Sequence, residues 1–433
     1  MSESISMVGL GKLGLPLAAC FSTCFETLGV DLDPLVVSAV NDGRSPWQEP
    51  GLAELIAATA GRSLRATTDH REAIARSTVT FVLVPTPSRT DGTFSSALLE
   101  RALGGLAEAL RHSSKDSHLF VISSTVMPGA IEATLIPLIE RISGRREGEG
   151  FDVCYVPDFV ALGETVKGFL HPELVVIGQR TSRAGDRVEA LYRRMCRNEP
   201  HVARMSVASA EIAKVALNAY ITVKITFANH LANICERVPG ADVDAITHAI
   251  GTDSRISRRY FTGGLAFGGT CFPRDTVAYR ALASVTGMTA PLIEATESIN
   301  AAQNDHLFET VQSYRPRRVG VLGVAFRPDT PVVEASPSLD LVRRLRESGV
   351  CVTAYDPLAR IDLGDGTAWS DLPEECLEGA DVAVLMHRSA AMKKAVESFQ
   401  AARPLTVIDC WRLLDAGAVD PNVTVRPLGR YAG

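Results

Sequence analysis

Cys271 lies in a glycine-rich segment, GGLAFGGTCFPRDT, which covers residues 263–276. Glycine lets a backbone approach a ligand closely and adopt positive φ angles, and a cysteine buried in a core needs neither. A thiolate can add to an aldehyde, and oxidation of the resulting thiohemiacetal gives a thioester that water cleaves to a carboxylic acid. Cys271 is therefore a candidate nucleophile for oxidising an alcohol, through an aldehyde, to an acid.

The first 31 residues predict the hydride acceptor that this chemistry needs. Residues 4–10, ISMVGLG, predict a buried strand, an apolar helix follows, and TLGVD predicts a second strand that ends at Asp31. The turn between the first strand and the helix is GLGKLG, formed by Gly9, Leu10, Gly11, Lys12, Leu13 and Gly14. An isolated G-x-G-x-x-G is often only a tight turn, but strand, helix and an acid about 20 residues on indicate a dinucleotide site. Asp31 would bind the ribose hydroxyls and repel a 2′-phosphate, which favours NAD over NADP.

Three more apolar runs predict further strands of the same sheet, each ending in a polar or proline-rich loop: TVTFVLVPTP (78–87), HLFVISSTV (118–126) and FDVCYVPDF (151–159). Ligands of parallel α/β sheets bind at the carboxyl ends of the strands. Thr86, Thr125 and Asp158 lie at such ends, so we expect them to face one crevice.

Residues 206–236 contain neither Gly nor Pro and predict one long, apolar helix. Lys214 and Asn218 are four positions apart and therefore share a face of that helix. They are a candidate functional pair, and the alternative is a solvated lysine beside an asparagine that the helix tolerates.

A second α/β unit begins at RRVGVLGVAF (317–326) and continues with a helix near 336–348 and a strand that ends at Asp356. This second unit lacks the third glycine of the G-x-G-x-x-G motif, so we expect it to bind a nucleotide and not a dinucleotide. The predicted fold is α/β, with two Rossmann-like, doubly wound parallel sheets joined by a long central helix and a helical linker domain. The predicted domains are residues 1–205 for the dinucleotide, 206–313 for the central helices and 314–433 for the second sheet, which we expect to bind a nucleotide.

Composition restricts the location and partners of the protein. Its 433 residues carry a net charge of −6, which argues against nucleic acid or an anionic membrane as the main partner. No apolar run is long enough to span a bilayer, and the amino-terminal segment resembles a strand and helix more than a signal peptide. The nine cysteines form no C-x-x-C pair, and no H-E-x-x-H occurs, so we expect a reducing cytoplasm and no metal site.

Taken in order, the motifs resemble those of the UDP-glucose/GDP-mannose dehydrogenase family over nearly the full length. They are GLGKLG, EPGL (49–52), VPTP with DG (84–92), SSTV followed by PG, PDF, Ala-Lys-x₃-Asn, FGGTCFPRD, and AFRPDT with SP (325–337). The resemblance implies a homodimer that oxidises the C6 alcohol of a nucleotide sugar to the uronic acid with two NAD⁺.

The resemblance also implies roles for individual residues. Cys271 would be the nucleophile, Asp275 the acid that assists proton transfer and water, Lys214 the cation facing the C6 oxyanion, and Asn218 its companion. Thr125 would hold a catalytic water, and Asp158 would support it. Expected cofactor contacts are the 9–14 turn, Asp31, Thr86, Thr125 and Arg274. Expected substrate contacts are Phe159, Val160, Ala161, Leu162, Lys214, Asn218, Tyr260, Phe261, Thr262, Gly263, Gly264, Gly268, Arg327 near the phosphates, and Arg255 from a neighbouring subunit.

Several departures from the family pattern affect the choice of sugar or, for Glu334, one phosphate contact. Asp158 replaces a glutamate, Leu162 stands where glucose-specific members carry a second glutamate, and Glu334 replaces a frequent arginine. Members that act on N-acetylhexosamine nucleotides also lack the second glutamate. UDP-glucose is the first expectation, and a UDP-N-acetylhexosamine or another nucleotide sugar is the alternative.

Two other classes of function remain open from the sequence. A single-hydride dehydrogenase of the hydroxyacid type would share the dinucleotide fold and the long helix, but it needs no cysteine loop. A non-catalytic, NAD-dependent regulator would need none of Cys271, Lys214, Asn218 and Asp275. The three classes differ in the NADH formed per sugar, which is two, one or none.

Overall fold

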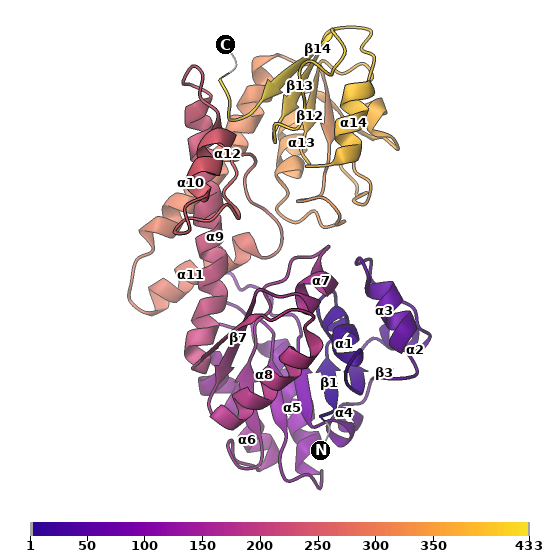
Figure 1. The fold of residues 1–433 in the computed structure, drawn as a ribbon, viewed down its shortest axis with the longest axis vertical. Helices are drawn as coiled ribbons and strands as arrows, with labels where there is room; N and C mark the ends of the chain where they lie inside the picture. The colour runs from indigo at the N-terminus through magenta and orange to yellow at the C-terminus, as the bar shows by residue number, and fades with distance from the viewer. Residues whose placement is uncertain (1–2, 432–433) are drawn as a thin grey trace. The chain divides into compact units, whose positions relative to one another are not determined.

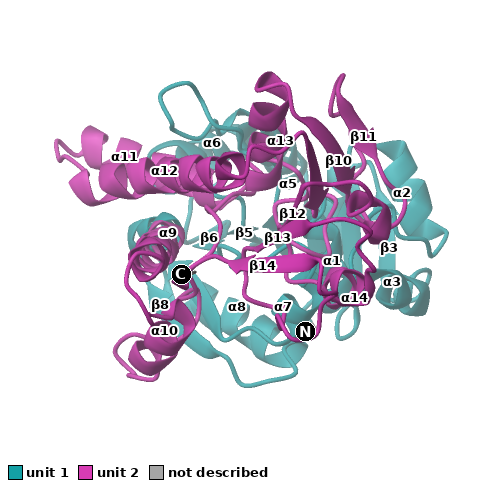
Figure 2. Ribbon diagram, turned by 90° about the horizontal axis from the view of Figure 1, so that it is seen from above, with its two compact units in different colours: residues 1–216 teal, residues 217–433 magenta. Residues whose placement is uncertain are grey.

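The computed structural model describes residues 3–431 and divides into two compact units, Met1–Ala216 (unit 1) and Leu217–Gly433 (unit 2), coloured separately in Figure 2. Unit 1 contains an eight-stranded sheet and unit 2 a six-stranded sheet. The boundary falls inside helix α9 (Val207–Cys235), which starts in unit 1 and continues into unit 2. This is the long helix that the sequence predicts over 206–236.

The sheet of unit 1 has the order β3-β2-β1-β4-β5-β6-β7-β8. Its strands are β1 (Ile5–Val8), β2 (Thr27–Val30), β3 (Leu64–Thr67), β4 (Val79–Val82), β5 (Leu119–Ile122), β6 (Asp152–Tyr155), β7 (Leu174–Gln179) and β8 (His201–Met205). The strand order reverses between β1 and β4, and folds of this kind bind dinucleotides beyond the carboxyl ends of the strands at that point. The sequence predicts β1, β2, β4, β5 and β6, but neither β7 nor its antiparallel pairing with β6.

Helices cover both faces of this sheet (Figure 1). Alternate strand residues point to opposite faces, so Met7 joins one core cluster and Val8 the other. Both faces are therefore apolar, as parallel strands require. The helices are α1 (Gly14–Ser22), α2 (Pro34–Asn41), α3 (Leu52–Thr59), α4 (His70–Arg76), α5 (Ala97–Arg111), α6 (Ile136–Ser143), which extends the π-helical turn η1 (Ile131–Leu135), α7 (Thr165–Leu170) and α8 (Ser182–Met195).

The sheet of unit 2 repeats this design with all pairs parallel, in the order β11-β10-β9-β12-β13-β14. Its strands are β9 (Arg318–Leu322), β10 (Cys351–Tyr355), β11 (Thr367–Trp369), β12 (Val382–Leu385), β13 (Leu405–Asp409) and β14 (Val423–Pro427). Its helices are α10 (Val243–Gly251), α11 (Phe272–Val285), α12 (Pro291–Ser313), α13 (Pro337–Glu347), the 3₁₀ turn η2 (Pro373–Cys376) and α14 (Ala390–Ser398). The fold class predicted from the sequence is thus confirmed, with one sheet in each unit.

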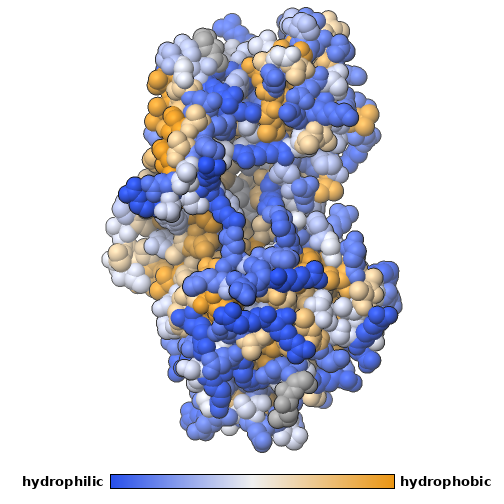
Figure 3. All heavy atoms as spheres, viewed as in Figure 1, coloured by the Kyte–Doolittle hydropathy of each residue, from blue (hydrophilic) through white to orange (hydrophobic). Residues whose placement is uncertain are grey.

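The visible surface is mainly hydrophilic, with scattered apolar side chains (Figure 3). Within residues 3–431, no helix combines the length and apolar character that crossing a bilayer requires.

Candidate active site

The predicted dinucleotide turn of unit 1 uses its three glycines for different purposes. Gly9 has a φ of +92°, and a Cβ there would lie 2.3 Å from the carbonyl oxygen of Leu83. A Cβ on Gly14 would lie 1.9 Å from the carbonyl oxygen of Gly9, so packing excludes a side chain at both positions. A Cβ on Gly11 would meet nothing within 4 Å. Gly11 therefore leaves open space at the start of α1, which fits the close approach of a pyrophosphate to a helix amino terminus.

Asp31 follows β2 and is bound to this same turn. Its Oδ2 accepts the backbone N–H of Leu10 at 2.7 Å, and its Oδ1 accepts that of Asp33 at 2.9 Å. Trp47 also holds the turn, since its indole N–H donates to the carbonyl of Leu10 at 2.8 Å. The glycine turn and the acid expected to bind ribose are thus one connected assembly, and these residues fit an NAD ribose and pyrophosphate.

Thr86 and Thr125 come together after β4 and β5. The hydroxyl of Thr86 donates to the carbonyl of Thr125 at 2.6 Å, and both threonines are buried. The loop that continues from Thr125 is anchored by Glu211 of α9, whose carboxylate accepts the N–H groups of Gly129 at 2.6 Å and Ile131 at 3.1 Å. Burial raises the pKa of the Glu211 carboxyl, while the two N–H groups oppose that rise. Sequence reasoning did not identify Glu211.

Lys214 lies near the predicted substrate loop after β6. Its ammonium donates to the carbonyl oxygen of Asp158 at 2.7 Å and lies 5.3 Å from the centre of the Phe159 ring. Lys214 is 5% exposed, so the alternative of a solvated lysine is wrong. The contact of Asp158 with Lys214 uses its backbone, which leaves the Asp158 carboxylate to other partners.

Glu49 of the EPGL motif fixes the far end of the substrate loop. Its two carboxylate oxygens accept the N–H groups of Gly163 at 2.9 Å and Thr165 at 2.8 Å. Gly163 has a φ of +87°, and Thr165 begins α7. Half-buried Val160 packs so closely on α7 that a Cβ on Gly168 would lie 2.8 Å from its Cγ1. The segment Phe159, Val160, Ala161 and Leu162 is thus fixed at both ends, by Lys214 and by Glu49.

In unit 2, Cys271 is exposed immediately before the first turn of α11. The hydroxyl oxygen of Thr270 lies 3.4 Å from the Cys271 sulfur. The Cys271 carbonyl accepts the backbone N–H of Asp275 at 2.8 Å. The Asp275 side chain is fully buried and turns toward α9, where its Oδ2 accepts from the Asn218 amide at 2.6 Å. Arg274 Nε lies 3.2 Å from the other oxygen. The structure therefore brings Asn218 and Arg274 to Asp275, one turn after Cys271. The sequence predicted Asn218 as the companion of Lys214 and Arg274 as a cofactor contact, and it did not predict their contacts with Asp275.

The glycines before Cys271 are required by packing against α9 and against loops of the second sheet. A Cβ on Gly263 would lie 2.7 Å from the carbonyl of Ala228, one on Gly264 would lie 2.5 Å from the Trp411 ring, and one on Gly268 would lie 2.1 Å from the carbonyl of Ala335. The loop is thus pressed against the loops that follow β9 and β13.

Buried amides hold the same loop, and sequence reasoning missed them. Asn229 of α9 accepts the N–H of Gly264 at 2.8 Å and donates to the carbonyl of Leu265 at 2.8 Å. Gln303 of α12 donates to the carbonyl of Gly264 at 2.6 Å. An amide side chain within a predicted helix can indicate such a role, but from the sequence only Asn218 was predicted to have one.

The remaining predicted substrate residues occupy different environments. Tyr260 has a φ of +56° and packs edge-on against Phe272, while Phe261 is buried and stacks on Phe227. Thr262 is half-buried beside them. The Arg255 side chain is 85% exposed and binds Asp253 at 2.6 Å. Arg327 is half-buried in the loop after β9.

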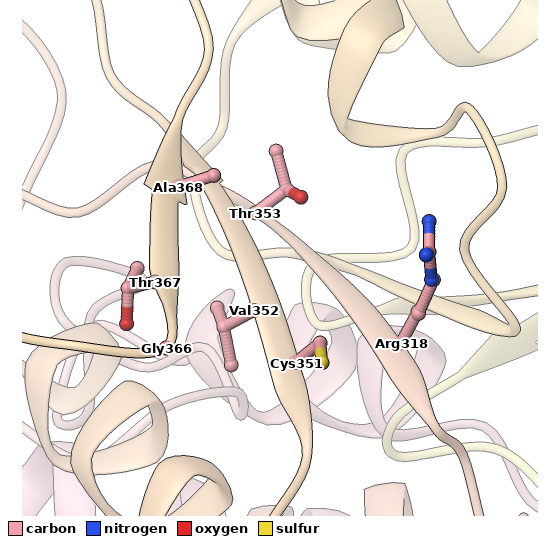
Figure 4. Close-up of a pocket in the computed structure, with 7 residues that line it drawn as sticks. All are labelled: Arg318, Cys351, Val352, Thr353, Gly366, Thr367 and Ala368. Carbon is pink, nitrogen blue, oxygen red and sulfur yellow. The ribbon is translucent and has the colours of Figure 1, made fainter.

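The surface pocket in Figure 4 contains none of the predicted site residues. Arg318, Cys351, Val352, Thr353, Gly366, Thr367 and Ala368 of the second sheet line it. Elsewhere within residues 3–431, no three His, Cys, Asp or Glu side chains gather closely enough to hold a metal ion.

Comparison with known proteins gives three consecutive family matches. Residues 3–196 match the NAD-binding domain of the UDP-glucose/GDP-mannose dehydrogenase family, residues 208–302 its central domain, and residues 320–416 its UDP-binding domain. The first range contains β1 to β7, the second begins in α9 and ends in α12, and the third begins in β9 and extends past β13.

Individual relatives agree with these matches. The chain is 35% identical over 419 residues to UDP-glucose 6-dehydrogenase AglM of Haloferax volcanii, covering 95% of this chain and 97% of that protein. The structure of a UDP-glucose dehydrogenase from Pyrobaculum islandicum superposes with a TM-score of 0.89 at 28% identity, over 100% of this chain and 98% of that one. A UDP-D-ManNAc dehydrogenase from Pyrococcus horikoshii gives 0.82 at 27% identity, over 99% of both chains.

Proposed function

The chain belongs to the UDP-glucose/GDP-mannose dehydrogenase family, and on that premise we propose that it oxidises the C6 alcohol of UDP-glucose to the carboxylate of UDP-glucuronate. The family is enzymatic and uses NAD. One observation carries the proposal. Cys271 is an exposed thiol that begins a helix, and the helix holds a buried Asp275 one turn further on, bound to Asn218.

The 9–14 turn and Asp31 would hold NAD, which would supply the hydride acceptor for two oxidations, first of the alcohol and then of the thiohemiacetal. Between these events the Cys271 thiolate adds to the C6 aldehyde, so a C–S bond forms and the carbonyl oxygen gains negative charge. The Lys214 ammonium stabilises that oxyanion, and Asn218 donates a hydrogen bond to it. Loss of the second hydride leaves a thioester on Cys271.

Hydrolysis needs a water near the acyl carbon and a group that takes its proton. Leu162 can do neither. In this proposal Asp275 takes the proton, Thr125 holds the water and Asp158 assists, after which the thiolate of Cys271 leaves. Arg274 steadies Asp275 through the contact of its Nε with the carboxylate.

Unit 1 supports NAD as the cofactor through Asp31, Gly11 and Thr86. Both Asp31 oxygens accept backbone N–H groups, so the side chain is held in one orientation where a ribose would lie. An NADP 2′-phosphate placed there would meet like charge. The residues that follow, Leu32 and Asp33, supply no cation.

Residues 159–162 are weaker evidence for one particular sugar than Cys271 and Asp275 are for the reaction. The relatives named above include dehydrogenases of UDP-glucose and of UDP-D-ManNAc. Leu162 in place of a glutamate is the feature that favours the second candidate, a UDP-N-acetylhexosamine.

We further propose a homodimer in the cytoplasm. Three residues of α9 spaced seven apart, Tyr220, Phe227 and Ile234, are 67%, 58% and 45% exposed, and together they form an apolar stripe suited to a second copy. The nine cysteines are all free thiols, as a reducing compartment favours.

A panel of nucleotide sugars incubated with NAD⁺ tests the function. The expected result is two NADH per UDP-glucose and formation of the uronate, with Cys271→Ala unable to form the acid while still binding NAD⁺. One NADH per sugar would establish the hydroxyacid-type reaction instead, and none with any sugar would favour a regulator. Greater turnover of UDP-GlcNAc or UDP-ManNAc than of UDP-glucose would establish the alternative substrate.

A further inference from the structure

Arg388 and Trp411 form a stacked pair at the carboxyl edge of the second sheet. Arg388 follows β12 and Trp411 follows β13, and these strands pair in parallel with Leu385 opposite Asp409. The Arg388 guanidinium lies 4.5 Å from the centre of the Trp411 ring. Neither residue belongs to the motifs that predict the active site.

Trp411 is held rigidly in this position. Its indole N–H donates to the carbonyl of Met386 at 2.7 Å, and its backbone N–H donates to Asp409 at 3.1 Å. Gly264 packs against the six-membered part of the indole, where a Cβ would lie 2.5 Å from Cζ3. Trp411 therefore contacts both the glycine-rich segment 263–276, through Gly264, and the Arg388 guanidinium.

The charge of Arg388 is not neutralised within the protein. Throughout residues 3–431, no carboxylate lies within ion-pair distance of its guanidinium, whereas its neighbour Arg412 forms a bidentate pair with Asp244 at 2.7 and 2.9 Å. Partial burial lowers the pKa of Arg388, the charge of Arg412 lowers it further, and Asp244 opposes both effects. An exposed cation that lies over an aromatic ring and pairs with no carboxylate is suited to bind an anion.

The position of the pair in the fold identifies the kind of anion. Ligands of parallel α/β sheets bind beyond the carboxyl ends of the strands. The loop after β9, which carries Arg327, lies on this same edge and is tied to β12, because His387 Nε2 lies 2.8 Å from the carbonyl oxygen of Ala325. Stacking on Trp411 occupies a face of the guanidinium and leaves its N–H edges available, the geometry that suits two phosphate oxygens.

We propose that Arg388, oriented by Trp411, is a binding residue for the diphosphate of the nucleotide sugar in unit 2. This inference rests on the proposed function, and it deepens it by naming the group that holds the phosphates. Arg388 donates hydrogen bonds to the diphosphate and takes no part in the bond changes at C6.

Calorimetric titration with UDP, uridine and pyrophosphate tests the proposal in wild-type protein and in Arg388→Ala. The variant is expected to bind UDP at least about 10-fold more weakly, because it loses charge-assisted hydrogen bonds, while uridine affinity stays unchanged. The wild-type affinity for UDP should also fall more steeply with salt than that of the variant. Arg388→Lys keeps the charge without the planar fork, and it is expected to recover only part of the loss.

Arg403→Ala is the matched control, because Arg403 pairs with Asp381 at the opposite edge of the same sheet. It should bind UDP as the wild type does. UDP affinity of Arg388→Ala within twofold of the wild type would overturn the proposal, and so would a loss confined to pyrophosphate. Thermal melting of each variant identifies a fold defect, in which case Arg388→Gln replaces the alanine variant.

These experiments distinguish an error in the Arg388 assignment from an error in the proposed reaction. If the wild-type protein forms no NADH with any nucleotide sugar, the proposed reaction is wrong, while the difference in UDP affinity between wild type and Arg388→Ala still stands on its own. If the wild type turns over UDP-glucose but Arg388→Ala binds UDP normally, only the Arg388 assignment is wrong.

Discussion

Replacing Asp275 with asparagine should arrest the reaction at the thioester on Cys271. Asp275 is fully buried, and its two oxygens accept from Asn218 and Arg274. An asparagine there presents one oxygen and one NH₂ group to two donors. Whichever way the amide turns, one hydrogen bond is lost and the proton acceptor for water is removed.

The two losses can be separated in magnitude. A hydrogen bond to a charged group contributes about 1.5–3 kcal/mol, which corresponds to a factor of about 10 to 150 if it is lost only in the transition state. Loss of a general base slows a step by a further ~10²- to 10⁴-fold. Acyl-enzyme breakdown in Asp275→Asn is therefore expected to slow by at least about 10³-fold. Asn218→Ala removes the hydrogen bonds to Asp275 and to the oxyanion but leaves the Asp275 carboxylate as the base, so we expect a smaller decrease with the pH dependence of hydrolysis retained.

Acid quenching at timed intervals, followed by intact-mass analysis, measures the adduct directly. Asp275→Asn mixed with UDP-glucose and NAD⁺ should accumulate protein heavier by one uronyl nucleotide, and Cys271→Ala should carry none. Asp305→Asn serves as the control, since Asp305 is exposed and pairs with Arg344 on the surface. Glu164, which lies between the 159–162 segment and α7, is the alternative base. Native-rate hydrolysis in Asp275→Asn, together with a stall in Glu164→Gln, would refute the assignment and make Glu164 the base.

Three further predictions concern other parts of the chain. Lys214→Ala should lower kcat by roughly 10²- to 10³-fold and change the KM for the sugar little, because the ammonium stabilises an oxyanion; a rise in KM alone would make Lys214 a binding residue. Glu49→Gln leaves one loop N–H without an acceptor and should raise the KM for the nucleotide sugar about 10-fold, and equal effects in Glu54→Gln, an exposed control on α3, would contradict this. Burial, followed by the charges of Lys115, Arg187 and Arg145, lowers the pKa of His118 from 6.5 to about 3. The unfolded chain therefore binds a proton that the folded protein rejects, and urea denaturation should show stability that is complete above about pH 6.5 and falls by about 1.4 kcal/mol per pH unit toward pH 3. His118→Asn should flatten that slope, and an unchanged slope would assign it to other groups.

The sequence predicted strands that are mainly apolar and followed by a polar, glycine-containing or proline-containing loop. The unit 1 strands β1, β4, β5 and β6 are of this kind, and each is buried along its whole length. Strand β8, His201–Met205, is only partly buried and polar, so its pattern does not separate it from a loop. The direction of β7 was not predictable either, because side-chain alternation is the same in parallel and antiparallel strands.

The candidate site was predictable where function fixes residue type within a short motif. Cys271 and Asp275 share one helical turn, and Lys214 and Asn218 share another. Glu49 has partners 114 and 116 residues away, and they are backbone N–H groups, which have no sequence signature. Local spacing therefore indicates which side chains share a motif, but not which acids hold a distant loop in place.

The loops around the predicted NAD and sugar sites of unit 1 share one mode of support, which explains how they can be both polar and fixed. Asp31, Glu49 and Glu211 each place two carboxylate oxygens on two backbone N–H groups of a loop. A carboxylate on two N–H groups satisfies donors that would otherwise require water or ligand, and it neutralises the positive end of a helix dipole where η1 and α7 begin. The loop backbones therefore do not depend on substrate for their hydrogen bonds. Their side chains, and the open space above Gly11, remain available to the ligand, so binding costs less conformational entropy than it would for mobile loops.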